Sequence, residues 1–219
     1  MIVNEFITND IPPLHSNDML EKALEWMAQF KVADLPVVDN KKYIGIISES
    51  DIIDYNKLNE KISESNIHLE KPFIYTHQHI YELFRLMTKY NVTVMPVLNE
   101  KDEYVGNVSA RGIIQNLSRI TSLQSTGGII VLSVPFKDYS AVQIANIIED
   151  NNAKILSMYV DVINNDWLEI TIKVNVEDVS RILQTFYRYS YQVKTVYQSS
   201  ESEIDLKRRL DEFWHFLNI

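Results

Sequence analysis

The sequence is poor in the residues that support several common chemistries. It contains no cysteine, so it can form no disulfide and has no thiolate nucleophile, as is typical of proteins in a reducing compartment. Its five glycines are isolated except for Gly127 and Gly128, so there is no glycine-rich loop of the phosphate-cradling kind. No apolar run approaches the length that spans a bilayer, and no basic segment precedes an apolar one at the start. We therefore expect a cytoplasmic protein with no signal peptide and no membrane contact.

The charge balance disfavours polyanionic partners. The chain carries 30 acidic and 21 basic residues, for a formal net charge of −9. It has no basic patch that could release phosphate counterions, so we expect no nucleic-acid binding. An anionic ligand would have to be held by local geometry, through backbone donors, hydroxyls and a few placed cations.

The first half of the sequence contains an internal repeat. The repeated motif comprises Leu35–Val38 (LPVV) and Gly45–Asp51 (GIISESD), and it recurs in weakened form as Met95–Leu98 (MPVL) and Gly106–Gly112 (GNVSARG). The displacement is sixty residues for the first segment and sixty-one for the second, so one residue is inserted between them. The duplication predicts two similar units packed about a pseudo-twofold axis, with ligand clefts between them. It favours a binding module over a catalyst.

Each copy is predicted to fold as a helix, two strands and a second helix. Apolar residues at helical spacing are followed by two apolar runs with a polar turn between them. Ser16 and Asn17 are suitable N-cap residues for the first helix. The predicted helices are 17–31, 78–90 and 111–120, with another from about Ser50, and the predicted strands are 35–38, 43–48, 93–98 and 104–109.

The character of the sequence changes after a Ser/Thr/Gly-rich stretch at 121–128, which is the clearest domain boundary. Strands and helices then follow in the order β-α-β-β-α-β, which is that of a ferredoxin-like unit. Residues 201–219 place apolar side chains on one stripe, which predicts an amphipathic helix that packs on the body or against a second subunit. The predicted strands are 129–134, 155–162, 167–174 and 192–197, and the predicted helices are 141–149 and 179–189.

The repeated motifs resemble those of the CBS domain, named after cystathionine β-synthase. The hallmark of that family is an apolar-Pro-Val-Val-Asp strand and then a Gly-apolar-apolar-Ser/Thr-x-x-Asp turn into a helix. Residues 1–120 look like a tandem pair of such domains. The resemblance implies an adenosine-nucleotide cleft in which Ser48 and Asp51 hold the ribose and phosphate, with Ser109 as the matching hydroxyl of the second copy. By position, the resemblance nominates for the adenine side Ile11, Pro12, Ala33 and Leu35.

Two interpretations of Ser48 and Asp51 remain open. A carboxylate in the first turn of a helix can accept both vicinal ribose hydroxyls, and the free N–H groups there can face a phosphate. The same Ser-x-x-Asp spacing is also a capping box, which requires no ligand.

The second copy departs from the pattern, because Gly112 stands where the carboxylate is expected. A ribose held by Ser109 alone lacks a charge-assisted contact worth about 1.5–3 kcal/mol. We therefore expect one good site, and a second that is empty, weak or specialised for another ligand. Arg111 and His77 are candidate phosphate contacts there.

The sequence offers no metal set and no assembled nucleophile. His77 and His79 diverge if they lie on a helix, and no third ligand is near them in sequence, so a capping or phosphate-facing role is expected. Neither histidine has a Ser/Asp or Cys partner at a sequence spacing typical of nucleophilic catalytic sites. We expect no metal site, no required cofactor and no enzymatic activity.

Residues 129–198 resemble an ACT domain, a β-α-β-β-α-β unit that many regulatory proteins use to bind amino acids. The family's ligand turn usually reads Asp-x-Pro-Gly, whereas this chain has Phe136–Ser140 (FKDYS) there. The turn keeps an acidic residue but lacks the glycine that lets a ligand approach the backbone closely. Ser140 is instead a suitable N-cap for the next helix. A dimerising or partner-docking role is at least as well supported as amino-acid binding.

The predicted fold class combines α/β and α+β units: a tandem CBS pair with pseudo-twofold symmetry, a ferredoxin-like ACT-type domain and a C-terminal amphipathic helix. Architecturally the chain is similar to the acetoin-utilisation accessory CBS proteins. The predicted domains are 1–60 and 61–122 for the two CBS repeats, 128–198 for the ACT-like domain and 200–219 for the terminal helix.

The functional prediction is a non-catalytic regulatory protein. It would bind AMP, ADP, ATP or another adenosine-containing molecule in the CBS cleft and pass the ligand state to the ACT-like domain by a conformational shift. We expect a homodimer with a downstream protein partner. The alternative is a constitutive dimeric assembly protein whose ligand clefts are vestigial.

Overall fold

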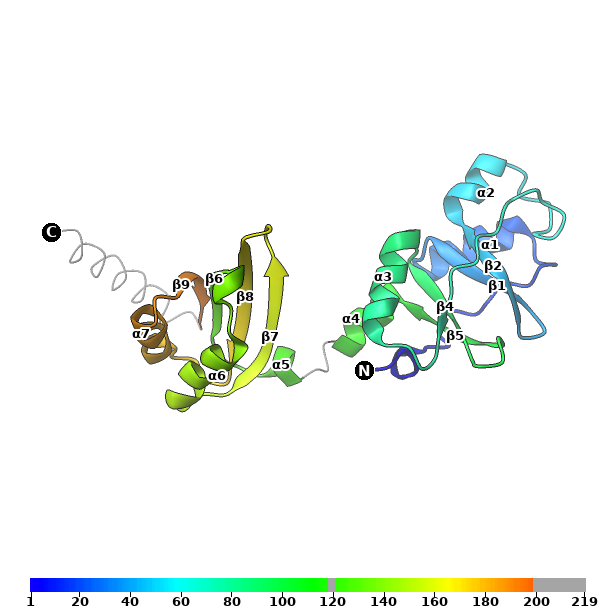
Figure 1. Ribbon diagram of the computed structural model, residues 1–219. Coiled ribbons are helices and arrows are strands. Elements are labelled where there is room, and N and C mark those ends of the chain that lie inside the picture. Colours follow the sequence, from blue (N-terminus) through cyan, green and yellow to red (C-terminus); the bar gives the residue numbers. More distant parts are fainter. Residues whose placement is uncertain (118–120, 199–219) are drawn as a thin grey trace. The chain divides into compact units, whose positions relative to one another are not determined.

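The protein forms two compact units in the computed structural model, Met1–Ser118 and Arg119–Ile219 (Figure 1). The structure describes residues 1–117 and 121–198. The first unit contains both repeats and the second contains the β-α-β-β-α-β segment. The predicted C-terminal helix, 200–219, lies outside the described residues.

The first repeat consists of α1 (Leu20–Phe30), β1 (Asp34–Asp39), β2 (Lys42–Ser48) and α2 (Glu49–Tyr55). β1 and β2 pair antiparallel, and they contribute Leu35, Val37 and Ile47 to the core. The buried side chains of its core are Ile11, Leu14, Leu20, Ala23, Met27, Leu35, Val37, Ile47, Ile52, Ile62 and Val94. Val94 comes from the second repeat, so the core of the first repeat already depends on its neighbour.

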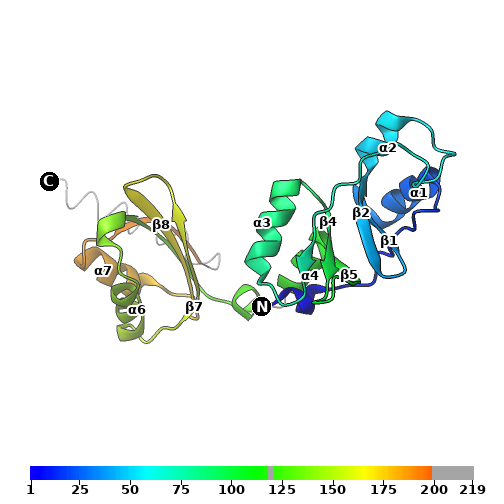
Figure 2. The same cartoon turned by 45° about the vertical axis from the view of Figure 1, so that its right-hand side comes forward.

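The second repeat repeats this order and adds one short strand. Its elements are β3 (Ile74–Tyr75), α3 (Ile80–Tyr90), β4 (Val94–Leu98), β5 (Tyr104–Ser109) and α4 (Ala110–Leu117). β3 runs parallel to β4, and β5 pairs antiparallel with β4 on its other side. Figure 2 shows α1 and α2 on the outer side of one sheet and α3 on the outer side of the other. The two sheets therefore lie between the helices, and β1 contacts β4.

The chain before each repeat crosses to the sheet of the other repeat. The backbone N–H of Thr8 donates to the carbonyl of Asn107 on β5 at 3.0 Å, and the N–H of Ile46 on β2 donates to the carbonyl of Glu70 at 2.8 Å. A short 3-10 turn, Val3–Phe6, accordingly buries Val3 and Phe6 in the core of the second repeat. The first residues of the chain thus complete the fold of the second repeat.

This crossing explains the glycine in each copy of the motif. A Cβ atom at Gly45 would lie 2.7 Å from the Leu69 side chain, and one at Gly106 would lie 2.5 Å from the Ile7 side chain. Gly106 also has a φ of +154°, which L side chains rarely adopt. Both positions need glycine because another segment passes directly over them.

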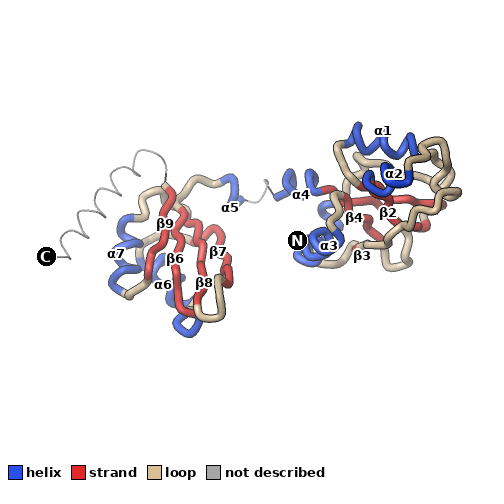
Figure 3. The backbone as a smooth tube through the Cα atoms, turned by 90° about the horizontal axis from the view of Figure 1, so that it is seen from above, coloured by secondary structure: helices blue, strands red, loops and turns tan. Residues whose placement is uncertain are grey.

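The second unit has a ferredoxin-like topology, which confirms the prediction. β6 (Ile129–Pro135), β7 (Ile155–Val162), β8 (Trp167–Val174) and β9 (Gln192–Tyr197) form one antiparallel sheet in the order β7-β8-β6-β9 (Figure 3). α6 (Ala141–Asp150) and α7 (Ser180–Arg188) cover one face of it (Figure 2). The chain enters through α5 (Thr121–Gln124) and turns between β6 and α6 through a 3-10 turn, Phe136–Asp138.

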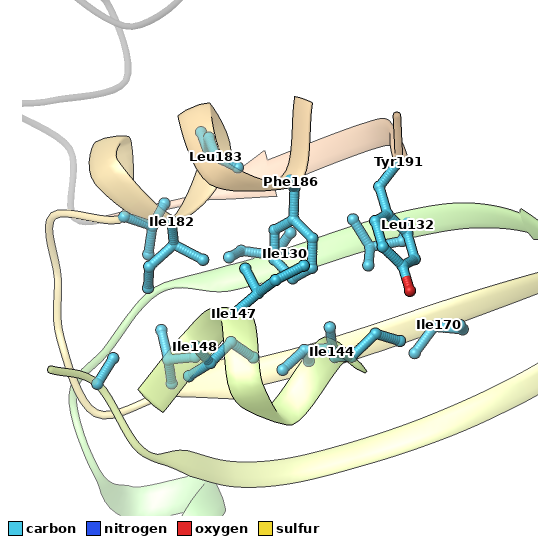
Figure 4. Close-up of a cluster of buried hydrophobic side chains, with 14 of the residues drawn as sticks. Ile130, Leu132, Ile144, Ile147, Ile148, Ile170, Ile182, Leu183, Phe186 and Tyr191 are labelled. Carbon is cyan, nitrogen blue, oxygen red and sulfur yellow. The ribbon is translucent and has the colours of Figure 1, made fainter. Parts of the chain in front are cut away.

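The core of this unit fills the space between its sheet and its two helices. The strands supply alternate residues, such as Leu168, Ile170 and Ile172 of β8, and the helices supply one apolar face each. Phe186 of α7 is fully buried at the centre of this cluster (Figure 4). Along the described part of the chain, no helix combines the length and apolarity that crossing a membrane would require.

Replacing Phe186 with alanine should destabilise the second unit by about 3–5 kcal/mol, because a large ring is lost from a site that cannot collapse fully. Gln184→Ala, on the exposed face of the same helix, is the matched control and should change the free energy of unfolding by less than about 0.5 kcal/mol. Urea unfolding followed by circular dichroism measures both. Equal effects of the two substitutions would contradict the assignment of this core.

Candidate functional site

The first candidate site lies where β2 passes into α2. Ser48 is the N-cap of α2, and its hydroxyl accepts a hydrogen bond from the backbone N–H of Asp51 at 3.1 Å. The same hydroxyl donates to the Asp51 carboxylate at 2.6 Å. The capping prediction is therefore confirmed. The cap also holds the hydroxyl and the exposed carboxylate side by side, so the two interpretations of this motif are compatible.

The four residues nominated for the adenine side separate into two groups. Leu35 is fully buried and Ile11 is 7% exposed, and both belong to the core of the first repeat. Ala33 is exposed and Pro12 is half-buried. The carbonyl of Ala33 accepts a hydrogen bond from the N–H of Glu49 at 2.8 Å, which joins Ala33 directly to the turn that contains Ser48. Ala33 is thus the nominated adenine-side residue that shares a hydrogen bond with this turn.

The second candidate site, where β5 passes into α4, is less accessible. The Ser109 hydroxyl accepts a hydrogen bond from the N–H of Gly112 at 3.0 Å, and Ser109 is only 7% exposed. A Cβ at Gly112 would lie 3.2 Å from that hydroxyl and 3.7 Å from the methyl group of Thr8. Arg111 beside it is exposed. The N-terminal segment therefore packs against this turn, at the position where the first turn presents an exposed carboxylate.

The two histidines before α3 each contact a neighbouring tyrosine ring, His77 by stacking and His79 edge-on. His79 is the N-cap of α3 and accepts a hydrogen bond from the N–H of Tyr81 at 3.3 Å, as the capping prediction requires. The His77 ring stacks on Tyr75 with their centroids 5.7 Å apart. Over residues 1–117 and 121–198, no three His, Asp or Glu side chains are grouped so that they could hold a metal ion.

A buried contact between the repeats was not predicted from the sequence. The Asp34 carboxylate, on a residue that is 5% exposed, accepts hydrogen bonds from the N–H of Thr93 at 2.8 Å and from its hydroxyl at 2.9 Å. The Thr93 hydroxyl also accepts from the N–H of Ala33 at 3.0 Å. The only signal in the sequence was an aspartate at the start of an apolar strand.

Asn107 is the centre of a second polar cluster at the same interface. This residue is fully buried, and its amide donates to the carbonyl of Ile11 at 2.8 Å and to the Tyr104 hydroxyl at 3.0 Å. Its Oδ1 atom has no hydrogen-bond partner among the described residues. The sequence did contain a signal here, because the equivalent position in the first repeat is the apolar Ile46.

Tyr43 and Tyr104 occupy equivalent positions in the two repeats, and burial raises the pKa of both phenols. The pKa of Tyr104 is raised to about 12, mainly by loss of hydration and against the hydrogen bond from Asn107. The pKa of Tyr43 is raised by burial and by the charge that Tyr104 would carry. The Tyr43 hydroxyl donates to the carbonyl of Pro72 at 2.8 Å.

The fold and the paired turns define a duplicated α/β module whose two sheets pack about a pseudo-twofold axis. A family model described as "CBS domain" matches residues 3–57 and 65–119, which together make up half of the chain. The chain therefore belongs to the CBS domain family, with two copies in tandem.

Curated relatives match parts of the chain at low identity. Inosine-5'-monophosphate dehydrogenase from Korarchaeum cryptofilum is 24% identical over 162 residues, which cover 74% of this chain and 32% of that protein. The chain spans between a quarter and a half of the length of the curated relatives that it matches.

Solved structures resemble about half of the chain. A protein from Vibrio cholerae named for acetoin utilization (AcuB) is 22% identical, with a TM-score of 0.50, over 57% of this chain and 95% of that one. A CBS domain pair/ACT domain protein from Thermotoga maritima is 21% identical, with a TM-score of 0.48, over 53% of this chain and 96% of that one. At these identities the likeness concerns the fold alone.

The buried phenols predict a loss of stability at high pH. A pKa raised in the folded state means that the unfolded chain releases its proton first, so the contribution is complete below pH 10 and is lost as pH rises toward about 12. Tyr104→Phe should make the fall in unfolding free energy between pH 10 and about 12 less steep, as measured by urea unfolding at each pH. A slope identical to that of the wild type would contradict the assignment.

Asn107→Ala should destabilise the first unit by about 1–3 kcal/mol, because the buried carbonyl of Ile11 loses its donor. Asn4→Ala, which removes an exposed amide from the segment packed on the same repeat, should change the stability by less than about 0.5 kcal/mol. Thermal unfolding of the two variants makes the comparison. An Asn107 variant as stable as the Asn4 variant would show that the amide contributes nothing.

Proposed function

We propose that the chain is a non-catalytic regulatory protein that binds an adenosine-containing ligand at the first turn, Ser48–Asp51. The observation that supports it is the adjacent placement of the Ser48 hydroxyl and the exposed Asp51 carboxylate at the start of α2. The turn lies in a CBS domain, and the CBS motif is what implies an adenosine cleft.

The polar chemistry of the turn suits a ribose. A carboxylate can accept both vicinal hydroxyls of a ribose through charge-assisted hydrogen bonds. Asp51 would exchange its present bond from Ser48 for these, which frees the Ser48 hydroxyl to donate to the ligand. Exchange of this kind costs little, because each buried or partly buried polar group keeps a partner.

The turn is less suited to a bare phosphate. The N–H groups of Glu49 and Asp51 are already paired with Ala33 and Ser48. Glu49 and Asp51 also place two carboxylates in the first turn, which repel an anion. A phosphorylated ligand at this turn would therefore need compensation from a cation, whereas the candidate phosphate contacts Arg111 and His77 belong to the second repeat. AMP, ADP, ATP and S-adenosylmethionine differ most in how much negative charge would need this compensation.

On the base side, Ala33 and Pro12 offer accessible surface, whereas Ile11 and Leu35 support that surface from the core. Ser109 could donate its hydroxyl hydrogen while it accepts from Gly112, but it is only 7% exposed and so is poorly placed to reach a ligand. We therefore assign the ligand to the first turn and propose that the second turn is empty or binds weakly.

The second unit would read the ligand state. A ligand that binds one arrangement of the repeats more tightly shifts the population toward it, and an attached domain can respond to that shift. Ser140 caps α6 by accepting from the N–H of Gln143 at 3.2 Å, so this turn serves the helix. We propose that the ACT-like unit mediates dimerisation and contact with a downstream protein, in the cytoplasm.

One specific observation favours a second function, that of a constitutive dimeric assembly protein. Gly112 stands where the motif has a ligand-binding carboxylate, and the hydroxyl of Ser109 is buried. A chain that has lost one cleft can retain the fold for assembly alone. A dimer that persists in the absence of any ligand, together with no binding of adenosine compounds, would support this alternative.

Thermal unfolding with millimolar AMP, ADP, ATP, S-adenosylmethionine or cyclic di-AMP tests the ligand assignment. A ligand at about a hundred times its dissociation constant adds roughly 2.7 kcal/mol, which raises the melting temperature by a few degrees. Asp51→Ala should abolish the shift.

Asp54→Ala is the matched control, because it removes an exposed carboxylate from the same helix but outside the motif. It should leave the shift intact. No shift with any of the five compounds in a folded protein would contradict ligand binding, and an equal loss in both variants would contradict the assignment to Asp51.

A further inference from the structure

Thr93 connects the two repeats through its backbone N–H and its side-chain hydroxyl. It lies between α3 and β4 in the second repeat, and the adjacent Val94 is fully buried in the core of the first. Its N–H and its hydroxyl both donate to the Asp34 carboxylate, at 2.8 and 2.9 Å. Its hydroxyl accepts from Ala33, and its carbonyl accepts from the N–H of Ala110 at 3.0 Å.

The buried carboxylate of Asp34 restricts the geometry of this contact. Asp34 is only 5% exposed, and Thr93 donates two hydrogen bonds to its Oδ2 atom. A buried carboxylate is costly unless hydrogen bonds replace its hydration. The first repeat therefore favours the position of Thr93 that supplies these donors.

From Thr93 the hydrogen bonds continue to the first ligand turn. The Thr93 hydroxyl accepts a hydrogen bond from the N–H of Ala33. The carbonyl of Ala33 in turn accepts one from the N–H of Glu49, the first residue of α2. Ser48, the N-cap, immediately precedes it. The side chain of a residue in the second repeat is thus two hydrogen bonds away from the backbone of the turn in the first.

We propose that Thr93 is a positioning residue for the first ligand turn, acting through Ala33 and held in place by Asp34. Its hydroxyl fixes the Ala33 peptide, which fixes the start of α2 and so the placement of Ser48 and Asp51. The affinity consequence rests on the proposed function of that turn. The backbone consequence does not, and can be measured without a ligand.

The test compares Thr93→Val, which keeps the shape but removes the hydroxyl, with Thr93→Ser, which restores a hydroxyl. Hydrogen exchange of the Glu49 amide, measured by NMR on the ligand-free full chain, should be about tenfold faster in Thr93→Val, because a hydrogen bond that restrains Ala33 is missing. Thr93→Ser should remain within about twofold of the wild type.

Affinity gives the second readout. For whichever of AMP, ATP or S-adenosylmethionine binds the wild type, calorimetry should show binding weakened by about five- to tenfold in Thr93→Val and restored in Thr93→Ser. Ile113→Val is the structural control, because it trims the core of the second repeat without removing a polar group. It should lower the melting temperature without changing affinity.

A Glu49 amide that exchanges no faster in Thr93→Val than in Ile113→Val would overturn the proposal, as would unchanged affinity in Thr93→Val. If Thr93→Val does not fold, Asp34→Asn replaces it and should accelerate exchange of the same amide, to a smaller extent. If the wild type binds none of the five adenosine compounds, the proposed function fails, and the exchange of the Glu49 amide alone decides the role of Thr93.

Discussion

The hydrogen bonds between the Asp34 carboxylate and Thr93 are the constraint on which the arrangement of the two repeats depends. Apolar packing alone tolerates small sliding of one sheet over the other, because dispersion and burial are not directional. A buried carboxylate does not tolerate it, since its donors must stay within hydrogen-bond distance. The contact therefore fixes how the turns at Ser48 and Ser109 are placed relative to each other.

The crossing of the chain makes the two halves interdependent and also unequal. The N-terminal residues complete the second repeat, and the segment at Leu69 and Glu70 completes the first. The N-terminal segment packs Thr8 near Gly112, so the second turn is buried. The first turn keeps an exposed carboxylate. The duplicated sequence has in this way produced one turn with an exposed carboxylate and one turn that is covered.

Much of the fold could be predicted from the sequence, because its elements follow clear patterns. The strand 104–109 and all four strands of the second unit were placed to within a residue. The predicted N-cap of α1 was wrong: the helix begins at Leu20 and Met19 stands at the cap, while Asp18 instead accepts from His15 and Lys22. β3 was missed, since a strand of two residues has no periodicity.

The candidate site was only partly predictable. The capping geometry of Ser48 and Asp51 is local, and their spacing specifies it. The burial of Leu35 depends on which face of β1 meets the helices, and the contact of Asp34 with Thr93 joins residues 59 positions apart. Such pairings require the register between the repeats, which no local pattern contains.

The central claim is that the first turn recognises an adenosine group. The most direct measurement is an NMR titration of the ¹⁵N-labelled full chain with AMP and, separately, with S-adenosylmethionine. The account predicts that at least one of them moves the amide signals of Ala33 and of residues 48–51 most, with smaller changes at residues 109–112. Saturable changes centred elsewhere, or none with either compound, would contradict it.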